Sequence, residues 1–270
     1  NKLIPYSMLL LGGLILLIAL FRLIRGKMKI EAGRSHIKVP RFTPFQRLVH
    51  WSVAILFVTL AFTGLILTFG RDGLIPIIGN EAFSWIAIIA KRIHDFAGPV
   101  FSIMIVVMLF TFMKGNFAKL VDVKWLVKAG GLFGGGHVSA GRYNAGEKAW
   151  YWFAMLAGAV VVVSGLILDF PIFGQERDFL TLTHVFHGVG AVIMIAASFG
   201  HIYMGTIGVE GAFEAMQTGY CDSNWAKEHH DIWYDEMAEE GKIGKTFEEL
   251  SDQEKMGSAH SGTSKSNLTT

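Results

Sequence analysis

The feature that most constrains this chain is a set of five long stretches that contain no Asp, Glu, Lys or Arg. Crossing the roughly 30 Å hydrocarbon core of a bilayer takes about 20 apolar residues in a helix. In lipid only a helix or a closed barrel satisfies the backbone, and these stretches are too uniformly apolar for half-buried strands. We therefore predict an all-α membrane protein with five transmembrane helices, at residues 3–21, 48–70, 96–113, 149–168 and 179–209.

The composition agrees with this prediction and excludes several classes of function. Apolar residues make up 52% of the chain and charged residues only 17%, which is more apolar surface than one compact core would bury. Cys221 is the only cysteine, so a disulfide framework, a protein-held iron–sulfur cluster and a C-x-x-C-H haem attachment are all excluded. The net charge of +2 is too small to indicate a nucleic-acid partner.

The basic residues indicate how the chain is oriented in the membrane. Residues 22–47 carry eight Lys and Arg and residues 114–148 carry six, whereas residues 71–95 carry three and residues 169–178 carry one. By the positive-inside rule the two basic connections are cytoplasmic. The N-terminus is then expected outside, and the tail that follows the last helix inside.

The ionisable residues expected within the spans are all histidines, which are functional hypotheses by default at such positions. They are His50, His94 at the outer start of the third helix, His184, His187 and His201. The alternating helix directions predict that His50 and His201 lie toward the cytoplasmic side and the others toward the outer side. His187 and His201 are 14 residues apart, about 21 Å of rise and within about 40° of four full turns, so they share a helix face. His184 misses that face by about 100°, so we expect it at the lipid interface or supporting a ligand.

Two pairs of facing imidazoles are what a b-type haem requires. Neutral ring nitrogens fill both axial positions of the iron, which leaves electron transfer rather than oxygen chemistry, and small residues leave room for the macrocycle. We therefore predict two haem b groups in a di-haem four-helix bundle, with one extra N-terminal helix. The small residues near the histidines are Gly64, Gly98, Gly188 and Gly190. A haem-free anchor or transporter is the alternative from another class, although a proton-coupled transporter would be expected to carry acidic residues in its spans.

A weak internal repeat links the second and fourth predicted helices. Residues 62–69 read FTGLILTF and residues 163–170 read VSGLILDF. A hydroxyl residue followed by glycine lets something approach the backbone closely. Two explanations stay open, which are small-residue helix packing and a flat cofactor against the helix.

Several short motifs carry a resemblance to a known family. They are RLVHW at 47–51, IH at 93–94 with Gly98, RYNAGEK at 142–148, His187 with HIYM at 201–204, and WAKEHHDIWY at 225–234. Over residues 41–240 the chain resembles the cytochrome b (gamma) subunit of membrane-bound respiratory formate dehydrogenase. The four histidines alone would also fit the cytochrome b of a nickel–iron hydrogenase or a thiosulfate reductase, which stays the alternative; the tail motif argues against it.

The resemblance implies a role for individual residues. It implies that His94 and His187 hold the outer haem and that His50 and His201 hold the inner one. It also implies that quinone, either menaquinone or ubiquinone, is reduced near the inner haem, with Asn144 and Gly146 close to its head group. A structural explanation for the same element is that Asn144 caps the following helix, with Glu147 completing a capping box, and both roles can hold together.

The resemblance further implies the surroundings of the chain. It would be a subunit of a formate:quinone oxidoreductase in the bacterial inner membrane, with a periplasmic N-terminus and a cytoplasmic C-terminus. Its partners would be a periplasmic iron–sulfur subunit and a catalytic subunit with a molybdenum or tungsten pterin. The extra first helix and His184 depart from the four-helix form of the family.

His229 and His230 are expected to be solvated or to dock a partner, rather than to bind metal.

The expected domain plan has four parts. They are an extra helix at residues 1–24, a basic cytoplasmic loop at 25–47, the di-haem domain at 48–209, and a partly disordered cytoplasmic tail at 210–270.

Overall fold

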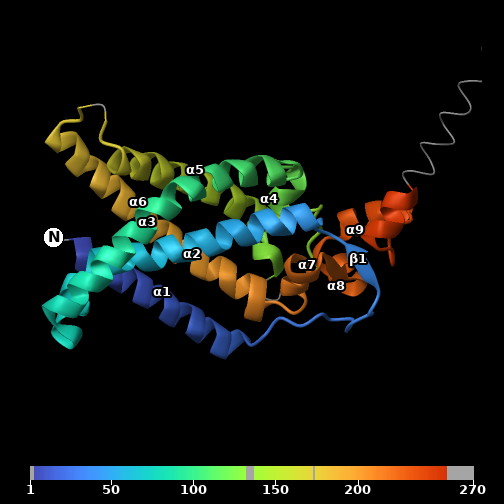
Figure 1. Ribbon diagram of the computed structural model, residues 1–270. Helices are drawn as coiled ribbons and strands as arrows, with labels where there is room; N and C mark the ends of the chain where they lie inside the picture. Colours follow the sequence, from blue (N-terminus) through green and yellow to red (C-terminus); the bar gives the residue numbers. More distant parts are fainter. Residues whose placement is uncertain (1–2, 132–136, 173, 254–270) are drawn as a thin grey trace, which may run out of the picture. The chain divides into compact units, whose positions relative to one another are not determined.

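The structure, a computed structural model, describes residues 3–131, 137–172 and 174–253 (Figure 1). The end of the tail, for which disorder is predicted, lies outside these residues from 254 onward. The helices and strands are α1 (Leu3–Arg25), β1 (Lys38–Pro40), α2 (Pro44–Gly73), α3 (Ile75–Met113), α4 (Leu120–Val127), η1 (Ala129–Gly131), α5 (Ala145–Asp169), α6 (Arg177–Tyr203), η2 (Met204–Gly208), α7 (Ala212–Thr218), β2 (Tyr220–Asp222), α8 (Ser223–His229) and α9 (Asp231–Glu239).

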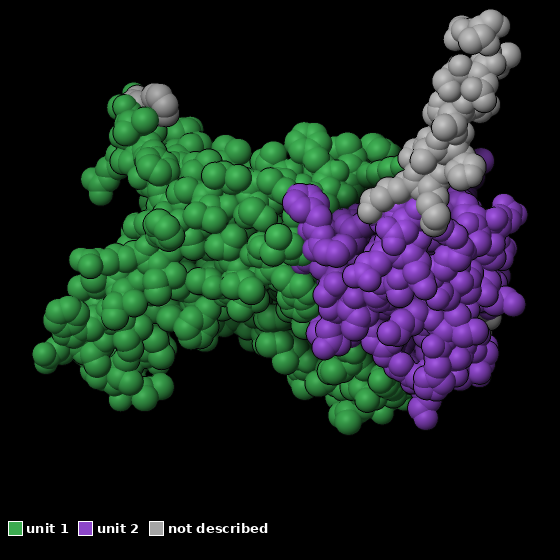
Figure 2. Space-filling view, turned by 45° about the vertical axis from the view of Figure 1, so that its right-hand side comes forward, with its two compact units in different colours: residues 1–27, 48–117, 147–208 green, residues 28–47, 118–146, 209–270 purple. Residues whose placement is uncertain are grey.

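The chain divides into two compact units, coloured separately in Figure 2. Unit 1 comprises residues 1–27, 48–117 and 147–208 and contains most of the long helices. Unit 2 comprises residues 28–47, 118–146 and 209–270, which are the basic connections and the tail. Each unit is described by itself.

Five helices of the described chain are long and apolar enough to cross a membrane: α1, α2, α3, α5, and α6 with its π-helical continuation η2. The prediction of an all-α membrane protein with five transmembrane helices is therefore confirmed, and the chain is a multi-pass membrane protein. Within unit 1, α2, α3, α5 and α6 run side by side (Figure 1). The extra helix α1 packs on α6, where the ring of Phe21 meets that of Tyr203 edge-on at 6.2 Å between centroids.

The third spanning helix begins earlier than its charge-free stretch predicts. It runs from Ile75, with a break in helical geometry at Gly79, where φ is +80°. Lys91 and Asp95, one helical turn apart, form an ion pair at 2.5 Å on its surface. Such a pair is compatible with a helix that extends beyond the hydrocarbon, so a boundary set by charges alone cut the helix short. As a result, His94 lies well inside α3 and not at its start.

Unit 2 is organised by a two-stranded antiparallel sheet that the sequence did not predict. Strand β1 pairs with β2 in a register that places Val39 opposite Cys221. Both of these side chains are buried. Next to them, the carboxylate of Asp222 accepts hydrogen bonds from the backbone N–H groups of His36 and Asn224, at 2.8 Å each. The predicted segments 25–47 and 210–270 are thus joined by β pairing and hydrogen bonds.

Candidate functional site

Four of the predicted site histidines form two facing pairs in unit 1. His50 of α2 lies beside His201 of α6, with ring centroids 6.3 Å apart and planes inclined by 56°. His94 of α3 lies beside His187 of α6, with centroids 6.2 Å apart and planes inclined by 80°. Helix α6 therefore supplies one imidazole to each pair, as its 14-residue spacing predicts.

The structure places His187, and not His184, beside His94. The side chain of His184 is exposed, and its Nδ1 lies 2.9 Å from the backbone carbonyl of Leu180 in its own helix. His184 is therefore on the outer surface of α6, where the helical phase predicts a lipid-interface residue.

The outer pair, His94 and His187, is held by hydroxyl groups from neighbouring helices. Thr63 Oγ1 of α2 lies 2.9 Å from His94 Nδ1. Ser164 Oγ of α5 lies 3.2 Å from His187 Nδ1, and the Val161 carbonyl oxygen lies 3.0 Å from the same nitrogen. In both rings Nδ1 is engaged, which leaves Nε2 as the nitrogen that can bind a metal.

The glycines that follow these hydroxyl residues explain the internal repeat. A methyl group on Gly64 would lie 3.2 Å from Cε1 of His94, and one on Gly165 would lie 3.1 Å from Cε1 of His187. The group that approaches the backbone is therefore a histidine ring from the adjacent helix, which is a form of small-residue packing. Beside His187, a methyl group on Gly188 would meet nothing within 4 Å, so α6 has open space there.

The inner pair, His50 and His201, is supported by aromatic rings instead. Trp150 of α5 stacks on His201 with centroids 4.6 Å apart and planes inclined by 9°. Trp51 meets the ring of His50 edge-on at 5.2 Å. Nδ1 of His50 is buried and has no hydrogen-bond partner among the described residues. The sequence does not reveal this role of Trp150, since one tryptophan among several carries no signal of its own.

The geometry of both pairs fits a metal held between two imidazoles. Two metal–imidazole bonds of about 2.0–2.1 Å, with the metal between the rings, bring the ring centroids to a separation of about 6.3 Å. The observed 6.2 and 6.3 Å agree with this value. Among the described residues, no cluster of three or more His, Cys, Asp or Glu could hold a metal ion. Each pair could thus supply only two ligands, which suits a haem because its macrocycle provides the other four.

The predicted quinone residues lie at the start of α5, in unit 2. Asn144 immediately precedes the first helical residue, Ala145, which is the position of an N-cap, and Glu147 lies in the first turn. A methyl group on Gly146 would lie 2.9 Å from Cη2 of Trp125 and 3.2 Å from Oδ1 of Asn144. Gly146 therefore has a packing role that the sequence did not reveal, because it allows the Trp125 ring of α4 to lie against this element.

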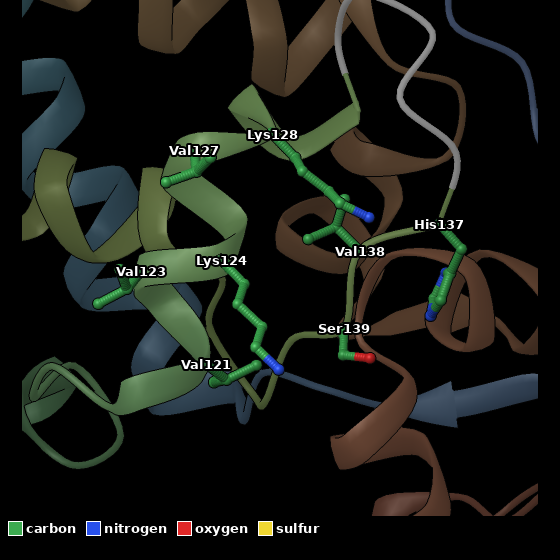
Figure 3. Close-up of a pocket in the computed structure, with 8 residues that line it drawn as sticks. All are labelled: Val121, Val123, Lys124, Val127, Lys128, His137, Val138 and Ser139. Carbon is green, nitrogen blue, oxygen red and sulfur yellow. The ribbon is translucent and has the colours of Figure 1, made fainter.

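A cavity of about 500 Å³ in unit 2 lies between α4 and residues 137–139 (Figure 3). It is lined by Val121, Val123, Lys124, Val127, Lys128, His137, Val138 and Ser139. His137 is engaged by Asp231, with 2.9 Å between Nε2 and Oδ2. The lining includes neither Asn144 nor Gly146, so this cavity does not coincide with the predicted quinone residues.

The tail histidine His230 is buried rather than solvated, which corrects the solvated alternative. Its Nε2 accepts a hydrogen bond from Arg41 at 3.1 Å, and its Nδ1 donates to the Gly141 carbonyl at 2.8 Å. Burial, together with the Arg41 charge, holds the pKa of His230 well below its ordinary value. The Arg41 guanidinium lies 5.1–5.9 Å from the rings of Phe42, Tyr143, Trp225 and Trp233. These contacts join the basic segment to the WAKEHHDIWY motif.

The single cysteine, Cys221, is buried, and its thiol donates to the Val39 carbonyl oxygen at 3.7 Å. Burial raises the pKa of the Cys221 thiol to about 11, so it stays protonated at neutral pH.

Comparison with known proteins gives the family. The prokaryotic cytochrome b561 family matches residues 41–219. The formate dehydrogenase cytochrome b556(fdo) subunit of Escherichia coli K12 is 30% identical over 203 residues, which is 74% of this chain and 93% of the relative. The nitrate-inducible cytochrome b556(Fdn) subunit of the same strain is 29% identical, over 75% of this chain and 93% of the relative. The cytochrome b556 subunit of Haemophilus influenzae is 28% identical, over 81% and 95%. The chain therefore belongs to the prokaryotic cytochrome b561 family, together with the cytochrome b556 subunits of formate dehydrogenase.

Proposed function

We propose that this chain is the membrane cytochrome b subunit of a formate dehydrogenase and that it carries electrons from an iron–sulfur subunit to membrane quinone. The observation that carries the proposal is that two facing imidazole pairs share one helix. Helix α6 supplies one histidine to each pair, and α2 and α3 supply the other two. The two α6 histidines are 14 residues apart, about 21 Å along the helix. This spacing suits two haem b groups at different depths in the membrane.

The chain's own residues limit the chemistry to electron transfer. A b-type haem bound between two imidazoles supplies reversible one-electron transfer at its iron. His94 with His187 would hold one haem, and His50 with His201 would hold the other. Two imidazole ligands disfavour oxygen binding and substrate activation at the iron.

The quinone site is proposed at the start of α5. The Asn144 amide can donate a hydrogen bond to a quinone carbonyl, and the neighbouring Trp125 ring offers a flat apolar surface. The order of residues along the chain supports this placement, because Asn144 comes only six residues before Trp150, which stacks on His201.

The surroundings of the subunit follow from the relatives and from the basic residues. The relatives are named as formate dehydrogenase subunits, so we propose a complex with a catalytic pterin subunit and an iron–sulfur subunit. The eight Lys and Arg of residues 22–47 support a cytoplasmic location for this segment, and for the tail that pairs with it. The membrane we propose is a bacterial inner membrane. The N-terminus, the partner subunits and the His94/His187 pair then belong to the periplasmic side.

Histidine variants of the purified complex test the ligand assignment. His187→Ala and His201→Ala should each lower the haem content from two to one per complex, with loss of the outer and the inner haem respectively. His184→Ala is the matched control on the same helix and should keep both. Haem loss in His184→Ala, with both haems kept in His187→Ala, would show that the assignment is wrong.

Replacement of Asn144 separates quinone binding from helix capping. Asn144→Ala should slow formate-to-quinone electron transfer while formate still reduces both haems. Asn144→Asp is the control, because Asp is an equally good N-cap but has no amide donor. If Asn144→Asp keeps full quinone activity while Asn144→Ala loses its haems, the role of Asn144 is capping alone.

The orientation predicts charge movement across the bilayer. Moving one elementary charge against 100 mV costs about 2.3 kcal/mol, so formate-to-quinone turnover in sealed vesicles should generate a potential, positive on the formate side, and slow against an imposed one. A voltage-sensitive dye and an intact-membrane control measure this. Full turnover without a potential would place quinone reduction on the formate side.

A further inference from the structure

Two hydroxyl side chains at equivalent places in α2 and α5 each reach a histidine of the outer pair. Thr63 Oγ1 lies 2.9 Å from His94 Nδ1, and Ser164 Oγ lies 3.2 Å from His187 Nδ1. Thr63 and Ser164 occupy the same position of the internal repeat, and each precedes a glycine against which the ring lies. The chain therefore builds the same contact twice, once for each ligand of one pair.

The direction of these hydrogen bonds follows from where the hydroxyl protons go. Thr63 Oγ1 donates to the Thr59 carbonyl at 2.8 Å, and Ser164 Oγ donates to the Val160 carbonyl at 2.6 Å. A hydroxyl has one proton, so its oxygen can only accept from the imidazole. The Val161 carbonyl, 3.0 Å from His187 Nδ1, can also only accept. From this network we infer that Nδ1 carries the ring proton and that Nε2 keeps its lone pair for a metal.

We propose that Thr63 and Ser164 are positioning residues that orient the outer histidines and lower the reduction potential of the haem which His94 and His187 would hold. The inference rests on the proposed function of this pair as axial ligands. An imidazole that donates its Nδ1–H to an oxygen is a more basic ligand at Nε2. A more basic ligand stabilises the oxidised iron, which lowers the potential.

Within the described part of the chain, no hydroxyl side chain supports the inner pair in the same way. Nδ1 of His50 is buried without a hydrogen-bond partner among the described residues, and His201 stacks on Trp150. The inner ligands are therefore expected to be less basic than the outer ones. The outer haem is then the one of lower potential, so electron transfer from the outer to the inner haem is energetically downhill.

Redox titration of the whole complex, followed at the haem α band, tests this inference. Thr63→Val and Ser164→Ala should both keep two haems. Thr63→Val should shift the reduction equilibrium of the lower-potential component about tenfold toward the reduced form, which raises its potential by about 59 mV for one electron. Ser164→Ala should raise it less, because the Val161 carbonyl still accepts from His187 Nδ1. Thr63→Ser and Ser164→Thr, which keep the hydroxyl, should restore it. Thr111→Val is the matched control, because in the described structure the Thr111 hydroxyl donates to the Val107 carbonyl of its own helix, at 2.7 Å, and contacts no histidine.

The outcomes separate this inference from the proposed function. Unchanged potentials in both hydroxyl-free variants, or a shift confined to the higher-potential component, would overturn the inference alone. The proposed function would be overturned if the unmodified complex contained fewer than two haems, or if the His94→Ala complex kept both. If Thr63→Val does not assemble, Ser164→Ala carries the test, because the Val161 carbonyl still holds the His187 ring in that variant.

Discussion

Adding a single methyl group to α5 should selectively weaken the outer haem site. In Gly165→Ala the new methyl group would lie 3.1 Å from Cε1 of His187, whereas two carbon atoms pack best at about 3.5–4.0 Å. The ring must therefore retreat by about 0.4–0.9 Å. Its hydrogen bond to Ser164, already 3.2 Å long, would then exceed the length of a true hydrogen bond.

The magnitude follows from two terms that act on different quantities. Overpacking of this kind costs about 1–3 kcal/mol, which corresponds to a weakening of haem retention by about 5- to 150-fold. Replacing glycine by alanine inside a helix also stabilises the helix by about 0.5–1 kcal/mol. The thermal stability of the complex should therefore change little while haem retention falls, and this combination distinguishes a local effect from general unfolding.

Haem transfer to excess apomyoglobin measures the effect. The purified Gly165→Ala complex should lose one of its two haems faster than the unmodified complex, and the other at the same rate. Gly13→Ala is the matched control, because a methyl group on Gly13 of α1 would meet nothing within 4 Å. If Gly165→Ala retains both haems as long as Gly13→Ala does, the close approach of His187 to Gly165 does not constrain the site.

Three further predictions concern the other parts of the structure. Trp150→Leu should weaken retention of the inner haem, whereas Trp150→Phe should largely preserve it because an aromatic ring can still stack on His201. Equal haem retention in both variants would show that stacking is unimportant. Unit 2 should become less stable as the pH falls below about 6.5. Burial lowers the pKa of His229 to about 4 and holds that of His230 well below its ordinary value, so the unfolded state binds more protons in this range. Hydrogen exchange of unit 2 amides, corrected for intrinsic rates, measures this, and protection that is constant from pH 7.5 to 5 would contradict it. Gly146→Ala should displace the Trp125 ring and slow quinone reduction without loss of haem, as measured by steady-state kinetics and haem content; unchanged kinetics would separate this contact from the quinone site.

The sequence predicted the parts of the structure that depend on periodicity along one helix. Bilayer thickness sets the length of a spanning helix, so the five charge-free stretches identified α1, α2, α3, α5 and α6. The pitch of an α-helix likewise predicted that His187 and His201, but not His184, share a face of α6. The start of α3 was missed, because Lys91 and Asp95 interrupt the charge-free stretch. In the structure the helix continues through both residues, which form an ion pair on its surface.

Contacts between residues far apart in the chain left no such signal. Arg41 and His230 are separated by 189 positions, and neither belongs to a periodic pattern that would predict their hydrogen bond. The pairing of β1 with β2 involves strands of three residues, too short for alternation to be recognised. The internal repeat could be predicted only in part. The sequence showed that α2 and α5 share a motif, but it did not show which group packs against the glycines.

The hydroxyls of the repeat also explain how the outer histidines can be oriented by side chains that carry no charge. A polar side chain within the membrane needs a partner, and Thr63 and Ser164 each find one in a carbonyl of their own helix, at Thr59 and Val160. Each oxygen can then accept from a histidine, so the contact to the ring leaves no polar proton unpaired. A carboxylate in the same place would bring a charge into the hydrocarbon at a cost of several kcal/mol. Back-bonded hydroxyls therefore let the chain orient its outer histidines through hydrogen bonds that add no charge to α2 or α5.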